Sequence, residues 1–373
     1  MSGVVRVGLI ADVQYSTQPD FGVGPGQIAW ASAAPWPVVY SNRPTTRRYA
    51  RSLDILRRGL QLWDAHGCEH AVILGDLLDK TAQRAGEVAG CLATLQGALR
   101  ASPARKHFLF GNGDAQILKR AGWVAHGFAA PGCTEAALYY SAQPAPGVRF
   151  IFLDTYDESA GRPGLPAPAR DAPPAGVVCE ASSEAAFAAA EAHLAAHQAA
   201  FAGLPPGEEA TWRACAARLS GAALTEAYAA QPYNGGVGAA QAAWLEGELR
   251  AAGAAGEAVF VFGHCPAHPF TCKPDGLQWR AAALRGLLER HPCVQAYVAG
   301  HDHDGGYFFE GGVHYLVPPA PLESEEEECF GMLRLGAGEW ALEWRGKAPP
   351  AGCGTLRGGE WPSGRPLPYR GVK

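Results

Sequence analysis

The stretch VVRVGLIADVQ at residues 4–14 contains the pattern that decides the fold. Residues 4–11 form a short, mostly apolar run with the length and chemistry of a β-strand, and the polar residues Asp12 and Gln14 follow it directly. Strands that read as near-continuous apolar runs are usually covered on both faces. We therefore expect an internal strand of an α/β structure, with polar residues at its carboxyl end.

Similar runs recur along the chain and are separated by segments with helical patterns. This alternation predicts a layered α/β sandwich. The other strand-like runs are 71–74, 106–110, 149–153, 258–262 and 295–299, and the helical segments are 47–66, 86–100, 239–252 and 279–290.

The composition excludes several classes of protein. Apolar residues make up 48% and charged residues 18% of the 373, a balance that can bury a core. A formal net charge of −5 gives no attraction for nucleic acid or an anionic membrane, and no run of 18 apolar residues predicts a membrane span. We expect a small-molecule partner and infer no protein partner.

Ten cysteines without a CxxC pair or regular spacing predict buried free thiols in a reducing compartment. A strand that begins almost at Met1 leaves no room for a signal peptide, so we expect a cytoplasmic protein.

We expect one elaborated domain at 1–345, with an insertion at about 160–230, and a C-terminal tail at 346–373. The insertion combines a Pro/Gly-rich loop, 161–176, with an Ala-rich segment, 184–230, that has helix propensity. The loop at 17–46 is interpreted either as a lid or as a surface loop. The acidic run 323–328 is expected to be a solvated face, and 332–342 to form a hairpin.

Polar side chains follow five of the six strand-like runs, and the carboxyl ends of strands gather at one edge of an α/β sheet. A single Gly-Asp is usually a turn, so the prediction rests on the joint pattern. Carboxylate and amide oxygens combined with imidazoles suit manganese, iron or zinc. With one bridging carboxylate, seven ligands are enough for two ions. The candidates are Asp12, Gln14, Asp76, Asn112, His264, His301 and His303.

In this order of motifs the chain resembles the calcineurin-like metallophosphoesterase superfamily. Within that superfamily it is most similar to the manganese-dependent ADP-ribose/CDP-alcohol diphosphatases. The resemblance spans about residues 4–335 and matches 160–230 poorly. It rests on Asp12-x-Gln14, Gly75-Asp76, Gly111-Asn112, Gly263-His264 and Gly300-His301-x-His303, and on the phrases GLIADVQY (8–15), LDTYD (153–157), YNGGV (233–237) and AGHDHDGGY (299–307).

The resemblance implies a four-layer αββα sandwich and two divalent ions. Manganese is the expected metal, and iron and zinc are the alternatives. Asp12, Gln14, Asp76 and His303 would hold one ion, and Asp76, Asn112, His264 and His301 the other. A hydroxide activated by both ions would attack phosphorus. The segment Asn234-Gly235-Gly236 would line the nucleotide side. Arg47 would face phosphate, although such an arginine is more often exposed.

Two positions depart from the family pattern. The family places a His after the ligand Asn, where it can protonate the leaving oxygen, and this chain has Gly113. A general acid commonly increases the rate by about 10²- to 10⁴-fold. Its loss should matter least when the leaving group is a phosphate, because that oxyanion is stable without a proton. Asp114 or water could substitute. Gly276 stands where animal members have Cys, and either opens the pocket near the adenine or is a turn glycine.

The resemblance therefore implies hydrolysis of the pyrophosphate bond in ADP-ribose or CDP-alcohols. A phosphodiesterase or phosphomonoesterase with other substrates is one alternative. A metal- or nucleotide-binding module with little turnover is another, because Gly113 replaces the acid.

Overall fold

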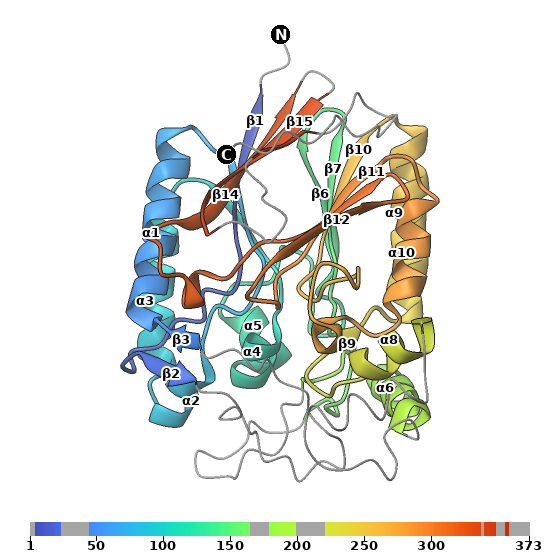
Figure 1. Cartoon of the computed structure of the whole chain (residues 1–373), viewed down its shortest axis with the longest axis horizontal. Helices are drawn as coiled ribbons and strands as arrows, with labels where there is room; N and C mark the ends of the chain where they lie inside the picture. The colour runs from blue at the N-terminus through green and yellow to red at the C-terminus, as the bar shows by residue number, and fades with distance from the viewer. Residues whose placement is uncertain are drawn as a thin grey trace.

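A computed structural model describes residues 4–23, 45–164, 179–198, 221–336, 339–347 and 355–357. Most of the segment 17–46, most of the Pro/Gly-rich segment 161–176, residues 199–220 of the Ala-rich segment and most of the expected tail lie outside these residues. Within them the chain forms two six-stranded mixed sheets that pack face to face (Figure 1).

The first sheet joins strands from both ends of the chain. Neighbouring strands β1, β4 and β5 run parallel, and β14 pairs antiparallel with β1 on its other side. The hairpin expected at 332–342 is thus confirmed as β14 and β15. In spatial order the strands are β16 (Thr355–Arg357), β15 (Glu339–Gly346), β14 (Cys329–Gly336), β1 (Val5–Ile10), β4 (His70–Ile73) and β5 (Arg105–Phe108).

The second sheet has four parallel strands in its centre and antiparallel strands at its edges. All six strands expected from apolar runs are present in the two sheets, within one or two residues of their expected ends. In spatial order this sheet contains β12 (Gly306–Glu310), β13 (Val313–Val317), β11 (Val294–Val298), β10 (Ala258–Phe262), β7 (Val148–Phe152) and β6 (Tyr140–Ala145).

Helices cover the outer face of each sheet, which gives the expected αββα order of layers (Figure 1). Helices α1 (Tyr49–Ala65) and α3 (Val88–Ala101) pack on the first sheet, and α9 (Ala239–Ala254) and α10 (Ala281–Glu289) on the second. A third apolar core, which includes Val7 and Phe260, fills the space between the sheets. Both faces of each sheet are therefore buried, as their apolar sequences indicate.

Gly8 shows how closely α1 packs on the first sheet. A Cβ atom at this position would collide with the ring of Trp63, which is fully buried. Trp63 also donates a 3.0 Å hydrogen bond from Nε1 to the carbonyl of Gly331 in β14. A larger side chain at residue 8 would have to displace this tryptophan from the core.

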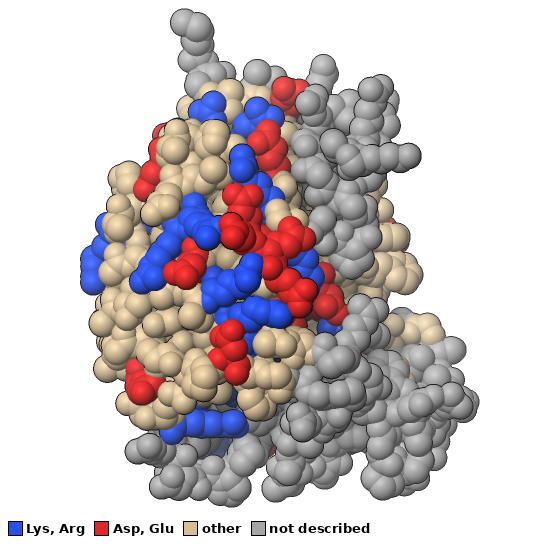
Figure 2. Space-filling view, turned by 60° about the vertical axis from the view of Figure 1, so that its left-hand side comes forward, with Lys and Arg blue, Asp and Glu red and all other residues tan. Residues whose placement is uncertain are grey.

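The acidic run packs along α1 instead of projecting freely into solvent. Arg48, the residue just before α1, and Arg58 of α1 pair with Glu325 and Glu327 at 2.9 and 2.6 Å. Figure 2 shows acidic side chains gathered against basic ones on this face. The expectation of a solvated face holds for Glu325, whose side chain is 83% exposed, but it is wrong for Glu323, which is 12% exposed and points inward.

The insertion contains two described helices, α6 (Glu184–Gln198) and α8 (Gly221–Ala229), beside the second sheet. Strand β16 pairs with β15, so the first sheet continues into the segment expected to be a tail. The domain boundary at 345 itself stays a prediction. The eight cysteines of the described residues are free thiols, as expected. No helix among those residues is long and apolar enough to cross a membrane.

Candidate metal centre

The seven candidate ligands follow parallel strands of both sheets and meet where these strands end. Asp12 and Gln14 follow β1, Asp76 follows β4, and Asn112 follows β5, where it begins α4 (Asn112–Ile117). His264 follows β10, and the loop that carries His301 and His303 follows β11. The first sheet thus supplies the carboxylates and amides, and the second supplies the imidazoles.

Distances within this cluster match ligands of the same ion or of two neighbouring ions. Nε2 of His264 lies 3.6 Å from Oδ1 of Asp76, 4.0 Å from Oδ1 of Asp12 and 3.3 Å from Oδ1 of Asn112. Nε2 of His303 lies 3.8 Å from Oδ1 of Asp12. Donor atoms around one first-row ion are roughly 3–4 Å apart, because metal–ligand bonds are about 2.0–2.2 Å. The donor set therefore fits divalent metal ions.

Each of the three histidines has one ring nitrogen bound to a protein group. Nδ1 of His264 lies 2.7 Å from the carbonyl of Leu74, and Nδ1 of His303 lies 3.1 Å from Glu323. Nε2 of His301 lies 2.8 Å from Oδ1 of Asn234. An acceptor on one nitrogen fixes the tautomer and leaves the other nitrogen as a potential ligand. The imidazoles are thus oriented by their surroundings.

The Gln14 side chain turns its amide nitrogen toward the cluster. Nε2 donates a 2.8 Å hydrogen bond to Oδ2 of Asp76 and lies 3.2 Å from Nε2 of His303. Its oxygen accepts a 3.2 Å hydrogen bond from Arg47. The nitrogen and oxygen of an amide exchange places by rotation about its last bond. Binding an ion through Oε1 requires that rotation, which would also release Arg47.

Backbone strain is concentrated at these residues. Among the described residues, six that are not glycine have positive φ, and four of them are Asp12, Gln14, Asp76 and His301, with φ between 42° and 71°. Side chains disfavour this left-handed region, and such strain persists where the surroundings enforce it, often at functional sites. The adjacent glycines are needed for space: a Cβ at Gly300 would lie 2.6 Å from Oδ2 of Asp12, and one at Gly111 would collide with Asp76.

Burial shifts the pKa of several groups in the cluster. Asp12, Asp76 and His264 are at most 1% exposed, and burial raises the pKa of Asp12 to about 6 although His264 and His303 oppose the shift. Burial and the neighbouring histidines lower the pKa of His301 well below its ordinary value, which favours the neutral ring. A buried carboxylate that binds protons so readily has less compensating positive charge than it needs, and a cation would supply it.

Glu323 contacts His303. The sequence does not mark it as a site residue, because it begins an acidic run that is expected to be solvated. Burial would raise its pKa, but His303 and Arg47 outweigh burial and lower it to about 2. Burial would likewise lower the pKa of His303, and Glu323 raises it instead. Each member of the pair therefore favours the charged form of the other.

Arg47 lies beside the cluster and is only 17% exposed. Its Nη1 donates a 2.7 Å hydrogen bond to Oδ2 of Asp79, and its Nε lies 4.0 Å from Glu323. Asp79 also caps α2 (Lys80–Ala85) by accepting from the amide of Thr81. Asp79 is a second residue missed in the sequence, although it stands three positions after Asp76 in Gly75-Asp76-Leu77-Leu78-Asp79.

The Asn234 segment has a structural role at the cluster. Nδ2 of Asn234 donates to the carbonyls of Ala229 and Leu277, and Oδ1 faces His301. A Cβ at Gly235 would collide with the carbonyl of Thr155, so close packing accounts for this glycine. Gly236 is buried beside it in β9 (Gly235–Gly236).

Gly276 lies close to the cluster as well. It ends the short helix η1 (Pro274–Gly276), and a Cβ there would lie 3.7 Å from Cδ2 of His301. A larger side chain at this position would therefore reach the same part of the site.

Asp114 is completely buried and accepts hydrogen bonds from the amides of Leu77 and Gly111. Burial and the charge of Asp76 raise its pKa well above the ordinary value. The amide of Gly113 donates a 2.7 Å hydrogen bond to Oδ1 of Asp76. Asp114 thus fixes the two loops that carry Asp76 and Asn112.

The LDTYD motif supports the cluster from behind. Arg120 of α5 (Lys119–Ala125) forms a buried 2.7 Å salt bridge with Asp154, and the hydroxyl of Tyr156 lies 3.4 Å from Oδ1 of Asn112. Oδ2 of Asp157 accepts from the amide of Gly238 at 3.0 Å. The motif thereby joins the loop after β7 to both α5 and the start of α9.

Comparison with solved structures identifies the fold first. The fold is that of a dimetal phosphatase: a crystal structure of a dimetal phosphatase from Danio rerio superposes with a TM-score of 0.73, covering 95% of this chain and 98% of that one at 24% identity. No family model matches the chain.

The resemblance to one group of enzymes is confirmed by sequence similarity over nearly the full length. The chain is 27% identical to the manganese-dependent ADP-ribose/CDP-alcohol diphosphatase of Danio rerio over 92% of its own length and 96% of that protein. It is also 27% identical to the protein of the same name in Oryza sativa, over 88% of this chain and 87% of that protein.

Proposed function

We propose that this protein hydrolyses the pyrophosphate bond of nucleoside-diphosphate-linked compounds such as ADP-ribose and CDP-alcohols. The reaction uses two divalent metal ions, for which manganese is our first candidate. The observation that carries the proposal is the convergence of seven oxygen- and nitrogen-donating side chains at one edge of the two sheets. The similar proteins of fish and rice are named for this activity and this metal.

In this proposal Asp12, Gln14, Asp76 and His303 hold one ion. Asp76, Asn112, His264 and His301 hold the other, with Asp76 shared. Bound divalent ions in such pairs lower the pKa of water and neutralise charge on the phosphoryl oxygens. The chain's own contribution is to fix the ligands before substrate arrives, because rigid ligands need no reorganisation during the reaction. The hydrogen bonds to Leu74, Glu323 and Asn234 serve this purpose.

Arg47 is proposed to bind a phosphate of the substrate. Its guanidinium is held by Asp79 at 2.7 Å, and Gln14 no longer accepts from it once Oε1 turns toward an ion. A guanidinium presents several donors in a fixed plane, so it can keep Asp79 and bind a phosphate oxygen at once. Gly276 leaves room on the side of His301, where we place the nucleotide.

The absence of a histidine at residue 113 favours substrates with a stable leaving group. Both oxygens of Asp114 already accept backbone hydrogen bonds, so we assign it a positioning role. A phosphate leaves without protonation, whereas an alkoxide does not. Pyrophosphate bonds therefore suit this site better than simple alkyl phosphates.

Turnover of ADP-ribose, CDP-choline and p-nitrophenyl phosphate with added Mn²⁺ tests the proposal. We expect hydrolysis of the first two into phosphomonoesters and weak hydrolysis of the third. Preferential turnover of p-nitrophenyl phosphate would favour a phosphomonoesterase. Binding of the nucleotides without turnover of any of the three would favour a binding module.

Gly113→His, with Gly113→Ala as its control, tests the leaving-group argument. A Cβ at residue 113 would lie 3.0 Å from the carbonyl of Leu78 and 3.2 Å from Oδ1 of Asp76, so both variants disturb Asp76 alike. Relative to alanine, histidine should increase the rate on alkyl phosphodiesters more than the rate on ADP-ribose. Equal gains on both would refute the argument.

The cytoplasm is the proposed location. The free thiols of the eight described cysteines support it, since free cysteines persist in reducing compartments. Localisation of the tagged full chain by microscopy, with fractionation as a check, would test it.

A further inference from the structure

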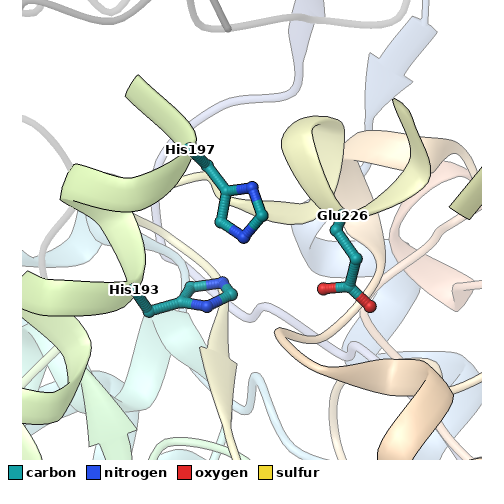
Figure 3. A group of neighbouring side chains, drawn as sticks. All are labelled: His193, His197 and Glu226. Atoms are coloured by element: carbon teal, nitrogen blue, oxygen red, sulfur yellow. The ribbon is translucent and has the colours of Figure 1, made fainter. Parts of the chain in front are cut away.

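A second group of metal-ligating side chains lies in the insertion, away from the proposed catalytic ions. His193 and His197 of α6 and Glu226 of α8 each offer one ligand atom, and these atoms all lie within 4.8 Å of one another. Figure 3 shows both imidazoles turned toward the carboxylate across the gap between the two helices.

The spacing of the two histidines explains why they share one side of α6. Residues i and i+4 of an α-helix lie one above the other, so His193 and His197 present adjacent rings; their centroids are 4.7 Å apart. The same spacing places two histidine ligands on a single zinc ion in helical HExxH motifs. Two imidazoles and one carboxylate are a ligand set that binds zinc in proteins, with the fourth position left to water or another ligand.

One nitrogen of this cluster is buried without a partner. Nε2 of His193 is shielded from solvent and has no hydrogen-bond partner among the described residues. A buried polar atom left unpaired is destabilising, so native structures usually provide a partner, an ordered water or an ion. A metal ion between the rings and the carboxylate would satisfy this atom.

Glu226 is held in place from its other side. Its Oε2 accepts a 3.2 Å hydrogen bond from the amide of Arg280, at the start of α10. This contact orients the carboxylate in the way that outer hydrogen bonds orient metal ligands. The same contact makes Glu226 a cap of α10, but a capping role does not require two histidines opposite the carboxylate.

Among the described residues, the apolar contact between α6 and its surroundings is small. The apolar cluster here consists of Ala190, Leu194, Ala230 and Trp279, and small side chains bury little area. His193 also lies beside Trp279, with ring centroids 5.2 Å apart. An ion that joins α6 to α8 would add a cross-link where the apolar core contributes little.

We propose that His193, His197 and Glu226 form a second, structural metal site that takes Zn²⁺ or a similar first-row ion and fastens α6 to α8. This site is separate from the proposed catalytic pair and does not depend on it. Its ligands are mainly nitrogen, whereas the catalytic cluster is rich in oxygen, so the two sites should differ in metal preference.

Equilibrium dialysis of the full-length, metal-depleted protein with Zn²⁺, followed by elemental analysis, tests the site. Wild type should bind one more ion per chain than His193→Ala or Glu226→Gln at the same free Zn²⁺. At this site, loss of one ligand should weaken binding by about 100-fold or more, because even outer-shell changes cost 10- to 100-fold. Glu191→Gln, an exposed acidic residue on the same helix, is the matched control and should retain the ion.

Two further measurements guard against misfolding and against interference from the catalytic site. The Co²⁺-loaded protein should lose part of its visible absorption in both variants, and that part should persist in Asp76→Asn. Circular dichroism and Mn²⁺-dependent turnover of ADP-ribose check that the variants fold. Equal Zn²⁺ stoichiometry in wild type, His193→Ala and Glu226→Gln would overturn the proposal, as would an equal loss in Glu191→Gln.

Discussion

The metal centre and the α6–α8 insertion are built in opposite ways. At the metal centre, one ring nitrogen of each histidine lies within hydrogen-bond distance of a protein oxygen, which orients the ring. In the insertion, two histidines face a carboxylate across a small apolar contact, and Nε2 of His193 has no hydrogen-bond partner in the part of the chain that the structure describes. The first arrangement is preorganised by the protein, whereas the second depends on what it binds. Four predictions test this difference between the two regions.

The largest effect is expected from Asp76→Asn, because this residue is shared by both proposed ions. Loss of the shared carboxylate removes charge from two sites, and metal ions commonly supply several kcal/mol of transition-state stabilisation. We expect turnover of ADP-ribose to fall by about 10³-fold or more. Steady-state kinetics with saturating Mn²⁺ would measure it.

Asp54→Asn is the control for this change. Asp54 is an exposed residue of α1 whose side chain is 61% accessible, and its substitution should leave turnover within about twofold. A comparable loss in both variants would mean that the effect is not local to the metal centre.

A pair of leucine truncations compares the cores of the two regions. Leu245 of α9 is fully buried against the second sheet, whereas Leu194 of α6 belongs to a small cluster with two alanines and Trp279. Large-to-small changes in a dense core cost about 2–5 kcal/mol, so we expect about 3 kcal/mol for Leu245→Ala and about 1 kcal/mol for Leu194→Ala. Urea unfolding of the metal-free protein measures both, and equal losses would contradict the contrast.

Glu323→Gln should weaken binding of Mn²⁺ without removing a ligand. The carboxylate orients His303 through Nδ1 at 3.1 Å, and outer partners of this kind contribute about 10- to 100-fold in metal affinity. Calorimetric titration gives the affinity. Glu325→Gln, in the same acidic run but exposed, should bind as wild type does. Unchanged affinity in Glu323→Gln would show that His303 is oriented without it.

The smallest expected effect is the pH dependence of this pair in the metal-free protein. The folded pKa of Glu323, about 2, lies below its ordinary value of 4.5, so its stabilisation is present above pH 4.5 and is lost as pH falls toward 2. His303, whose pKa is raised, stays protonated over this range. The stability gap between wild type and Glu323→Gln should shrink by about 1–2 kcal/mol from pH 5 to pH 3.

Reversible unfolding followed by fluorescence at each pH would check this. A gap that stays constant or widens on acidification would show that the two groups are not an ion pair in solution.

The sequence was informative where local pattern and tertiary role coincide. The six apolar runs form strands, five of them internal and one, β5, at the edge of its sheet. Strands that are covered on both faces are mostly apolar, and the parallel arrangement brings together the residues that follow them. Strands with mixed composition were missed. The β6 segment, YSAQPA, alternates in burial and contains a proline, so it lacks the signal of an internal strand.

Contacts between distant segments could not be derived in the same way. Nothing local to Glu323 indicates that it turns inward to His303 while Glu325 stays exposed, because that difference depends on where η2 (Pro321–Glu323) lies against α1. Likewise, Asn234 was placed on the nucleotide side through family resemblance, and its contact with His301 became visible only in three dimensions.

The place of β14 beside β1 has a consequence for biosynthesis. The first strand made pairs on one side with a strand that begins at Cys329, so the ribosome must complete most of the chain before that sheet can close. Until then β1 presents an open edge, which invites pairing with other nascent chains. Stalled or truncated translation products that end before residue 329 should therefore be prone to aggregate and to recruit chaperones.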